Sequence, residues 1–355
     1  MINDVLSKFR NLSGILTLHV KQSIKPKLQL DELTAGIVGG DRVVLGQAIT
    51  LVESNLEADQ VLAEQLIKNI LPLTGKALRV GITGVPGVGK STFIEAFGRH
   101  IISEGKKPAV LTIDPSSELT KGSILGDKTR MEELSRNPQA FIRPSASSHV
   151  LGGVALKTRE TIFLCEAAGY DVNIIETVGV GQSEVAVRNM TDFFLLLMLA
   201  GAGDQLQGIK KGIIEIADAI VITKADGDNV TSASAAQLVY QQALQLLTAP
   251  PSGLQPRVLT SSAHTGQGMS DIWKLILKHK NETLASGYFE DNRTRQNIAW
   301  FTEYFNHLVN LELQRSTPLQ TERKKLEQAV REYQLSAPEA ARKLLEAYHQ
   351  SFPNK

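Results

Sequence analysis

The sequence predicts an α/β fold in which a mostly parallel central sheet is flanked by helices, with helical extensions at both ends of the chain. Short apolar or β-branched runs alternate with amphipathic stretches between residues 77 and 282, and this alternation is typical of parallel strands joined by helical crossovers. The run Phe193–Leu199 is apolar at every position, as expected for a strand that is covered on both faces. Residues before 77 and after 282 have helical rather than strand-like patterns.

The N-terminal segment, residues 1–76, is predicted to form helices that pack against the main domain. Apolar residues recur with helical spacing over residues 42–54 and 60–70, until Pro72 and Gly75 end the pattern. In the main domain, residues 77–282, the predicted helices are residues 91–104, 154–168 and 232–247. The predicted strands are residues 79–83, 109–113, 172–176, 193–199, 219–223 and 257–260.

The C-terminal segment, residues 283–355, is predicted to form three charged, amphipathic helices over residues 297–315, 319–333 and 337–352. The first of them carries a stripe of large apolar side chains, which favours a dimerisation arm over a solvated helical tail. The stripe consists of Trp300, Phe301, Tyr304, Phe305, Leu308 and Leu311.

The composition indicates which binding partners and which cellular compartment to expect for this protein. Lys and Arg number 38 and Asp and Glu 37, so the net charge of +1 gives no reason to expect nucleic acid or an anionic membrane as a partner. The single cysteine, Cys165, excludes an intramolecular disulfide and is expected to be buried. The N-terminus lacks the pattern of a signal peptide, and residues 193–200 are too short to cross a bilayer, which takes about 20 residues. We therefore expect a soluble, cytoplasmic protein.

A glycine-rich motif lies between the first predicted strand of the main domain and the helix that follows it. Residues 84–91, GVPGVGKS, match the pattern G-x-x-x-x-G-K-[ST], whose backbone N–H groups and helix N-terminus bind phosphate. Lys90 is expected to bridge the β- and γ-phosphates, and Ser91 is expected to bind Mg²⁺. The fold is therefore predicted to be that of a P-loop nucleotide hydrolase. The predicted phosphate-binding residues are Gly84, Val85, Pro86, Gly87, Val88, Gly89, Lys90, Ser91 and Thr92.

Three acidic residues could complete the phosphate site. Asp114 and Glu176 follow predicted strands, and Asp127 lies in the segment GDKTR. Ligands of open parallel sheets bind beyond the carboxyl ends of the strands, so these acids are expected near the phosphate loop. Asp127 and Glu176 are predicted to bind Mg²⁺ with Ser91, although an acidic residue after a strand is often only a helix cap. The N–H of Gly179 is expected to contact the γ-phosphate.

Two later segments predict a guanine site. Thr223-Lys224-Ala225-Asp226 and Ser261-Ser262-Ala263-His264 each follow a predicted strand and resemble the [NT]-K-x-D and S-A-[KL] elements of GTPases. Asp226 would accept hydrogen bonds from guanine N1 and N2, which adenine cannot supply. Threonine at position 223 departs from the commoner asparagine, and an ordinary strand-to-helix turn is the alternative. The predicted base-site residues are Thr223, Lys224, Asp226, Ser262, Ala263 and His264.

Six segments together resemble the MeaB/ArgK group of SIMIBI-class GTPases: GVPGVGKS, IDPSS, GDKTRM, ETVGVGQSE, TKADGDN and SSAHTGQG. The resemblance extends over residues 30 to 310. It implies a homodimeric G-protein chaperone that binds GTP, GDP and Mg²⁺ and couples GTP hydrolysis to the loading and protection of adenosylcobalamin in methylmalonyl-CoA mutase. It also implies metal and switch roles for Asp127 and Glu176, a switch role for Asp114, and a partner-responsive loop over residues 202–211 with Asp204 and Lys210 as its charged members.

The expected reaction is in-line attack of water on the GTP γ-phosphate, with Lys90 stabilising the developing charge. Gln182 is a candidate for positioning that water, with a plain loop residue as the alternative. Arg130 and Arg188 are candidates for an arginine finger. Two other functions stay open: a nucleotide-dependent kinase acting on a small molecule or a transport-related protein, and a dimeric scaffold in which the nucleotide is structural. The predicted catalytic residues are Lys90, Asp114, Asp127, Glu176 and Gln182.

Overall fold

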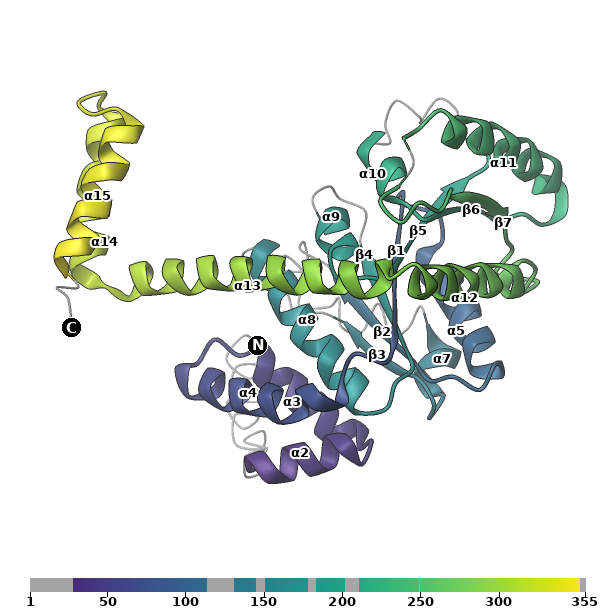
Figure 1. Ribbon diagram of the computed structural model, residues 1–355, viewed down its shortest axis with the longest axis horizontal. Coiled ribbons are helices and arrows are strands. Elements are labelled where there is room, and N and C mark those ends of the chain that lie inside the picture. The colour runs from purple at the N-terminus through teal and green to yellow at the C-terminus, as the bar shows by residue number, and fades with distance from the viewer. Residues whose placement is uncertain are drawn as a thin grey trace, which may run out of the picture.

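The computed structural model describes residues 28–113, 131–144, 151–177, 183–201, 211–248 and 250–351. Within these ranges, seven strands form one sheet in the order β3-β2-β4-β1-β5-β6-β7, and every neighbouring pair is parallel (Figure 1). The predicted parallel α/β fold is therefore confirmed. The strands are β1 Leu78–Gly84, β2 Pro108–Ile113, β3 Phe141–Pro144, β4 Val172–Thr177, β5 Phe193–Leu199, β6 Ala219–Thr223 and β7 Arg257–Thr260.

Six of these strands lie where the sequence predicts them, with ends that shift by at most a residue. The strand β3 was not predicted, because its four residues, FIRP, include a charged residue and a proline. Such a strand is tolerated at the edge of a sheet, and β3 pairs only with β2.

Helices cover both faces of the sheet. On one face, α5, α7 and α12 enclose a core that includes Phe93, Phe97 and Trp273. On the other face, α2, α3, α4, α8, α9 and α11 share a second core, in which Cys165 is buried as predicted. These helices are α2 Leu30–Val38, α3 Arg42–Glu53, α4 Glu57–Ile70, α5 Lys90–Ser103, α7 Glu132–Arg136, α8 Leu151–Ala167, α9 Ser183–Arg188, α11 Val230–Gln245 and α12 Met269–Ala285. Three further short helices are η1 Leu71–Leu73, α10 Lys211–Ile216 and η4 Gly227–Asn229.

The N-terminal helices are built into the second core. Leu45, Ile49 and Leu66 have no exposed surface, and α3 and α4 pack against α8. Asp41 caps α3 by accepting a hydrogen bond of 2.8 Å from the N–H of Val43. The predicted N-terminal segment thus shares its apolar interior with the sheet.

The C-terminal helices extend away from the main domain. Helix α13 (Tyr288–Arg315) continues from α12, so the predicted boundary between residues 282 and 283 falls inside α12. Its first half lies along the main domain, and beyond it α14 (Thr317–Arg331) and α15 (Ala337–Ser351) form a hairpin that stands apart (Figure 1). None of the helices in the described ranges combines the length and the hydropathy that a membrane crossing requires.

The start of α13 is fixed by one buried arginine. Arg293 donates to both carboxylate oxygens of Asp192, at 2.8 and 2.7 Å, and to the carbonyl oxygens of Gly75 and Ala77. Gly75 and Ala77 precede β1, and Asp192 precedes β5, so Arg293 joins the arm to the central strand β1 and to its neighbour β5. Further along α13, the ring of Trp300 packs edge-on against Phe163 with centroids 5.4 Å apart.

Candidate nucleotide-binding site

The phosphate loop lies between the end of β1 at Gly84 and the start of α5 at Lys90, as the sequence predicts. Gly87 and Gly89 adopt φ angles of +79° and +91°, which side chains with a Cβ rarely tolerate. At Gly84, a Cβ would lie 2.6 Å from the carbonyl oxygen of Leu197 on β5. Glycine is therefore required at Gly84 by close packing and at the other two positions by backbone conformation.

Lys90 lies among carboxylates at the start of α5. Its Nζ donates a hydrogen bond of 2.9 Å to the carbonyl oxygen of Gly84. Burial lowers the pKa of the Lys90 ammonium, and the charges of Glu176 and Glu184 act in the opposite direction. Both carboxylates are buried, with 7% and 1% of their surface exposed. Lys90 and Glu176, two of the predicted site residues, therefore lie close enough for the charge of one to act on the other.

Two site residues were not singled out by the sequence reasoning. One is Glu184, whose signal is its spacing: it lies three residues before the apolar Val187, so both face inward from α9. The other is Thr177, whose hydroxyl donates a hydrogen bond of 2.8 Å to the hydroxyl of Thr83. This bond joins β1 and β4, because Thr83 lies just before the phosphate loop and Thr177 just after Glu176. The sequence did not indicate it, because a threonine within an apolar strand does not by itself predict a hydrogen bond to a neighbouring strand.

The residues at the end of β6 contact the phosphate loop directly. The Thr223 hydroxyl donates hydrogen bonds to the carbonyl oxygens of Val88, at 2.9 Å, and of Met198, at 3.3 Å. The Lys224 ammonium donates a bond of 3.0 Å to the carbonyl oxygen of Gly87. Lys224 adopts a φ of +57°, which directs the chain from the strand into η4. Two motifs that are far apart in the sequence therefore form one site.

The Asp226 carboxylate is oriented by the loop after β7. The buried hydroxyl of Ser262 donates a hydrogen bond to it, and the N–H of Thr265 donates to the same hydroxyl at 3.2 Å. The Ala225 N–H donates to the carbonyl oxygen of Ser261 at 3.0 Å, which holds the two segments together. Ala263 and His264 follow on this loop, and the His264 side chain is exposed. A carboxylate held in this way can accept paired N–H donors.

Several predicted site residues lie outside the described residues. They are Asp114, Asp127, Gly179, Gln182, Asp204 and Lys210, together with the finger candidate Arg130. Within the described ranges, no group of three histidine, cysteine or acidic side chains is placed to hold a metal ion. Ser91 and Glu176 do belong to the described part, and their oxygen atoms are of the kind that Mg²⁺ prefers.

One candidate is placed elsewhere by the structure. Arg188 forms an ion pair of 3.0 Å with Asp218, which comes directly before β6. The amino ends of parallel strands lie at the edge of the sheet opposite to the phosphate loop. The hypothesis that Arg188 is an arginine finger is therefore wrong, because its guanidinium is held by a carboxylate at the opposite edge.

Comparison with protein-family models matches residues 45–317 to the family described as methylmalonyl-CoA mutase-associated GTPase MeaB. The GTPase ArgK of Escherichia coli is 52% identical over 274 residues, which cover 76% of this chain and 83% of ArgK. The mitochondrial methylmalonic aciduria type A homolog of Mus musculus is 44% identical, covering 92% of this chain and 81% of that protein. A solved structure described as a LAO/AO transport system kinase superposes with a TM-score of 0.71 at 41% identity, covering 90% of this chain and 97% of that one.

Proposed function

Since the chain belongs to the MeaB family of methylmalonyl-CoA mutase-associated GTPases, we propose that it is a G-protein chaperone that binds methylmalonyl-CoA mutase. In this proposal, GTP hydrolysis is coupled to the loading and protection of adenosylcobalamin in the mutase. The resemblance inferred from six sequence segments is confirmed by the family match, and the protein is a GTPase. The partner assignment is supported by the family's description and by the mouse relative.

One observation carries the assignment of the nucleotide site. Thr223 and Lys224 bind the backbone of the phosphate loop, and Asp226 follows them on the same segment. The loop that binds phosphate and the segment that selects the base are thus held in fixed positions relative to each other, as a nucleotide site requires. Asp226 selects guanine by accepting from N1 and N2, and its site rejects adenine because the carboxylate would lose both donors.

Hydrolysis proceeds by in-line attack of water on the γ-phosphate. Lys90 and the N–H groups of the phosphate loop stabilise the negative charge that develops there, with the positive N-terminal end of α5 behind them. Gln182 orients the water and Gly179 senses the γ-phosphate in this proposal. Turnover is slow until the mutase acts on the switch segments, which include Asp204 and Lys210.

The donor set fits Mg²⁺. Ser91 offers a hydroxyl next to Lys90, and the buried Glu176 offers a carboxylate whose charge acts on the same lysine. We infer that Ser91, Glu176 and Asp127 hold the ion and that Asp114 is the switch acid. When bound, Mg²⁺ neutralises charge on the β- and γ-phosphates.

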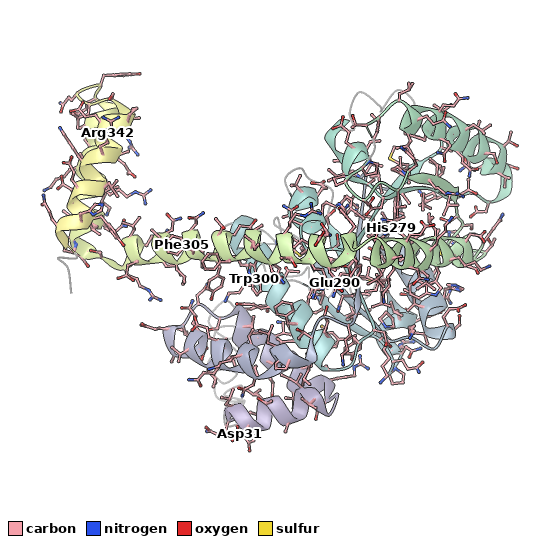
Figure 2. All side chains as sticks on the ribbon, viewed as in Figure 1. Asp31, His279, Glu290, Trp300, Phe305 and Arg342 are labelled. Atoms are coloured by element: carbon pink, nitrogen blue, oxygen red, sulfur yellow. The ribbon has the colours of Figure 1, made fainter. Side chains whose placement is uncertain are left out.

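The protein is further proposed to be a homodimer joined by its C-terminal arm. Beyond Trp300, which packs on α8, helix α13 exposes Phe301, Phe305 and Leu308, with 71%, 57% and 45% of their surfaces accessible. Figure 2 shows Phe305 on the part of α13 that has left the main domain. Large apolar side chains on such an extension favour contact with a second copy over a solvated tail.

Phosphate release from GTP and from ATP, with and without purified methylmalonyl-CoA mutase, tests the proposal. The expected result is hydrolysis of GTP alone, accelerated by the mutase. GTP hydrolysis that is indifferent to the mutase would leave the GTPase in place and remove the proposed partner. Using γ-labelled GTP, appearance of the label on a third molecule instead of free phosphate would favour a kinase. Binding without turnover, even beside the mutase, would favour the scaffold.

A further inference from the structure

We propose that Asn229 is a positioning residue of the guanine site. Its side-chain amide holds the loop that carries Lys224 and Asp226, and it thereby sharpens the selection of guanine over a base that lacks the 2-amino group. Asn229 lies three residues beyond Asp226, at the end of the segment TKADGDN. The inference rests on the proposed function, because it requires a guanine nucleotide to bind against Asp226.

Asn229 binds this loop at two points. Its Nδ2 donates a hydrogen bond of 2.7 Å to the carbonyl oxygen of Lys224, and its backbone N–H donates one of 3.0 Å to the carbonyl oxygen of Asp226. Both bonds use main-chain carbonyl groups of the loop. The Lys224 ammonium therefore stays available to the phosphate loop, and the Asp226 carboxylate stays available to a base.

The backbone of Lys224 needs this support. Its φ of +57° lies in the left-handed region, which residues with a Cβ rarely occupy. Such a conformation persists only where the surrounding contacts determine it. The Asn229 amide holds the carbonyl group of Lys224, while the Lys224 ammonium is bonded to the carbonyl oxygen of Gly87. Without the amide, the Lys224 carbonyl group would lose this donor, and the loop would relax toward an ordinary backbone conformation.

The helices that follow do not use the side chains of Asp226 and Asn229. Asp226 is the N-cap residue of η4 and Asn229 is that of α11, and both residue types are preferred caps because their side-chain oxygen accepts from the first turn. Neither side chain forms such a capping bond. The Asp226 carboxylate instead accepts from the hydroxyl of Ser262, and the Asn229 amide donates to Lys224. These contacts favour a base-binding segment over a plain strand-to-helix turn.

The position of the Asp226 carboxylate matters most for a base that offers two donors. Guanine presents its N1–H and its 2-amino group side by side, whereas hypoxanthine presents N1–H alone. A paired contact requires the carboxylate to lie in the plane of the base, while a single hydrogen bond tolerates a tilt. A loosened loop therefore weakens the binding of a guanine nucleotide more than that of a hypoxanthine nucleotide.

The test measures dissociation constants of the full chain for GDP and for IDP, the hypoxanthine nucleotide, in the presence of Mg²⁺. The wild type is expected to prefer GDP, and N229A should lower this preference about fivefold, since one hydrogen bond to a carbonyl oxygen is lost. N229D keeps the shape of asparagine but has no N–H donor when ionised, and it should lower the preference in the same direction. In a D226A background, N229A should change the preference no further.

The steady-state kinetics separate positioning from a general loss of structure. For N229A the KM for GTP should rise while kcat stays near that of the wild type, because the phosphate loop and its lysine are unchanged. Melting temperatures show which variants are folded, and N229D carries the same test if N229A does not fold.

N310A is the matched control. Asn310 donates from its side-chain amide to the carbonyl oxygen of Asn306 at 2.9 Å, on the part of α13 that extends away from the main domain (Figure 1). The variant removes the same kind of bond and should leave both dissociation constants unchanged. An unchanged preference in folded N229A, or equal losses of GDP and IDP affinity, would overturn the inference. A wild-type protein that binds GDP no better than IDP would instead refute the proposed contact of Asp226 with guanine.

Discussion

The hydroxyl of Thr223 donates a hydrogen bond of 2.9 Å to the carbonyl oxygen of Val88, which fastens the end of β6 to the phosphate loop. Thr223 stands where asparagine is commoner in guanine-recognition elements, and this departure makes the sequence motif a weaker indication of a guanine site. In the structure the residue is 5% exposed and its hydroxyl has two backbone acceptors. A short polar side chain therefore suffices at this position.

Replacing Thr223 with valine tests this link, because valine has nearly the same shape but no hydroxyl. T223V leaves the buried carbonyl oxygen of Val88 without this donor, at a cost of about 1–3 kcal/mol. We expect GTP to bind several-fold more weakly and the melting temperature to fall. T223S, which keeps the hydroxyl, is the control. Equal GTP affinity of T223V and T223S would show that the bond does not support the site.

Removing the ammonium of Lys90 should abolish turnover. K90A takes away the charge that stabilises the γ-phosphate as it is transferred, while the backbone N–H groups of the loop remain. Phosphate release measured under saturating GTP is expected to fall to the background rate. A K90A protein that hydrolyses GTP normally would refute the assignment of the phosphate loop.

The base preference should depend on Asp226. In D226N the side-chain amide can donate to the carbonyl group that xanthine has at position 2, whereas guanine there carries an amino donor. The variant is expected to lose affinity for GTP and to gain affinity for XTP, as measured by competition between the two nucleotides. If D226N keeps the wild-type preference for GTP, Asp226 does not contact the base.

The attachment of the C-terminal arm should depend on Arg293. R293M removes the partner of Asp192 and leaves a buried carboxylate uncompensated, which costs about 3–5 kcal/mol. Urea unfolding should show this loss of stability, and the double variant R293M/D192N should recover part of it. R295M changes an exposed arginine on the same helix and should unfold like the wild type. Wild-type stability of R293M would mean that the arm is held by other contacts.

Stability should fall in mild acid because of His279. Burial lowers the pKa of His279 below its usual value, and this effect outweighs the attraction of Asp218, which also binds Arg188. In the unfolded chain the imidazole of His279 has a pKa of about 6.5. Just below that pH, the unfolded chain therefore binds more protons at this residue than the folded protein does. The contribution of His279 to the free energy of unfolding is therefore complete above the pKa that this residue has in the unfolded chain. It is lost as the pH falls through the lower pKa that the residue has in the folded protein.

Melting temperatures of the wild type and H279Q at pH 7.5 and at pH 5.5 check this sign. The decrease between the two conditions should be smaller in H279Q, because glutamine does not titrate. Equal decreases in the two proteins would assign the acid sensitivity to other groups.

Much of the fold could be predicted because its signals are local. An apolar run such as Phe193–Leu199 and the pattern around Lys90 lie on consecutive residues, and short-range sterics and burial determine the elements they form. The short edge strand β3 could not be predicted in this way, because FIRP acquires its strand conformation from pairing with β2.

The sequence alone determined the phosphate loop, the base motif and their order along the chain, since each is a short segment whose chemistry depends on its own residues. Only the tertiary structure decided which distant side chains share a site. It placed Glu176 and Glu184 where their charges act on Lys90, joined Thr223 to Val88, and held Arg188 at the opposite edge of the sheet. These contacts depend on how helices and strands pack against one another. Packing brings together residues that are far apart in the sequence, and no local sequence pattern indicates which of them will touch.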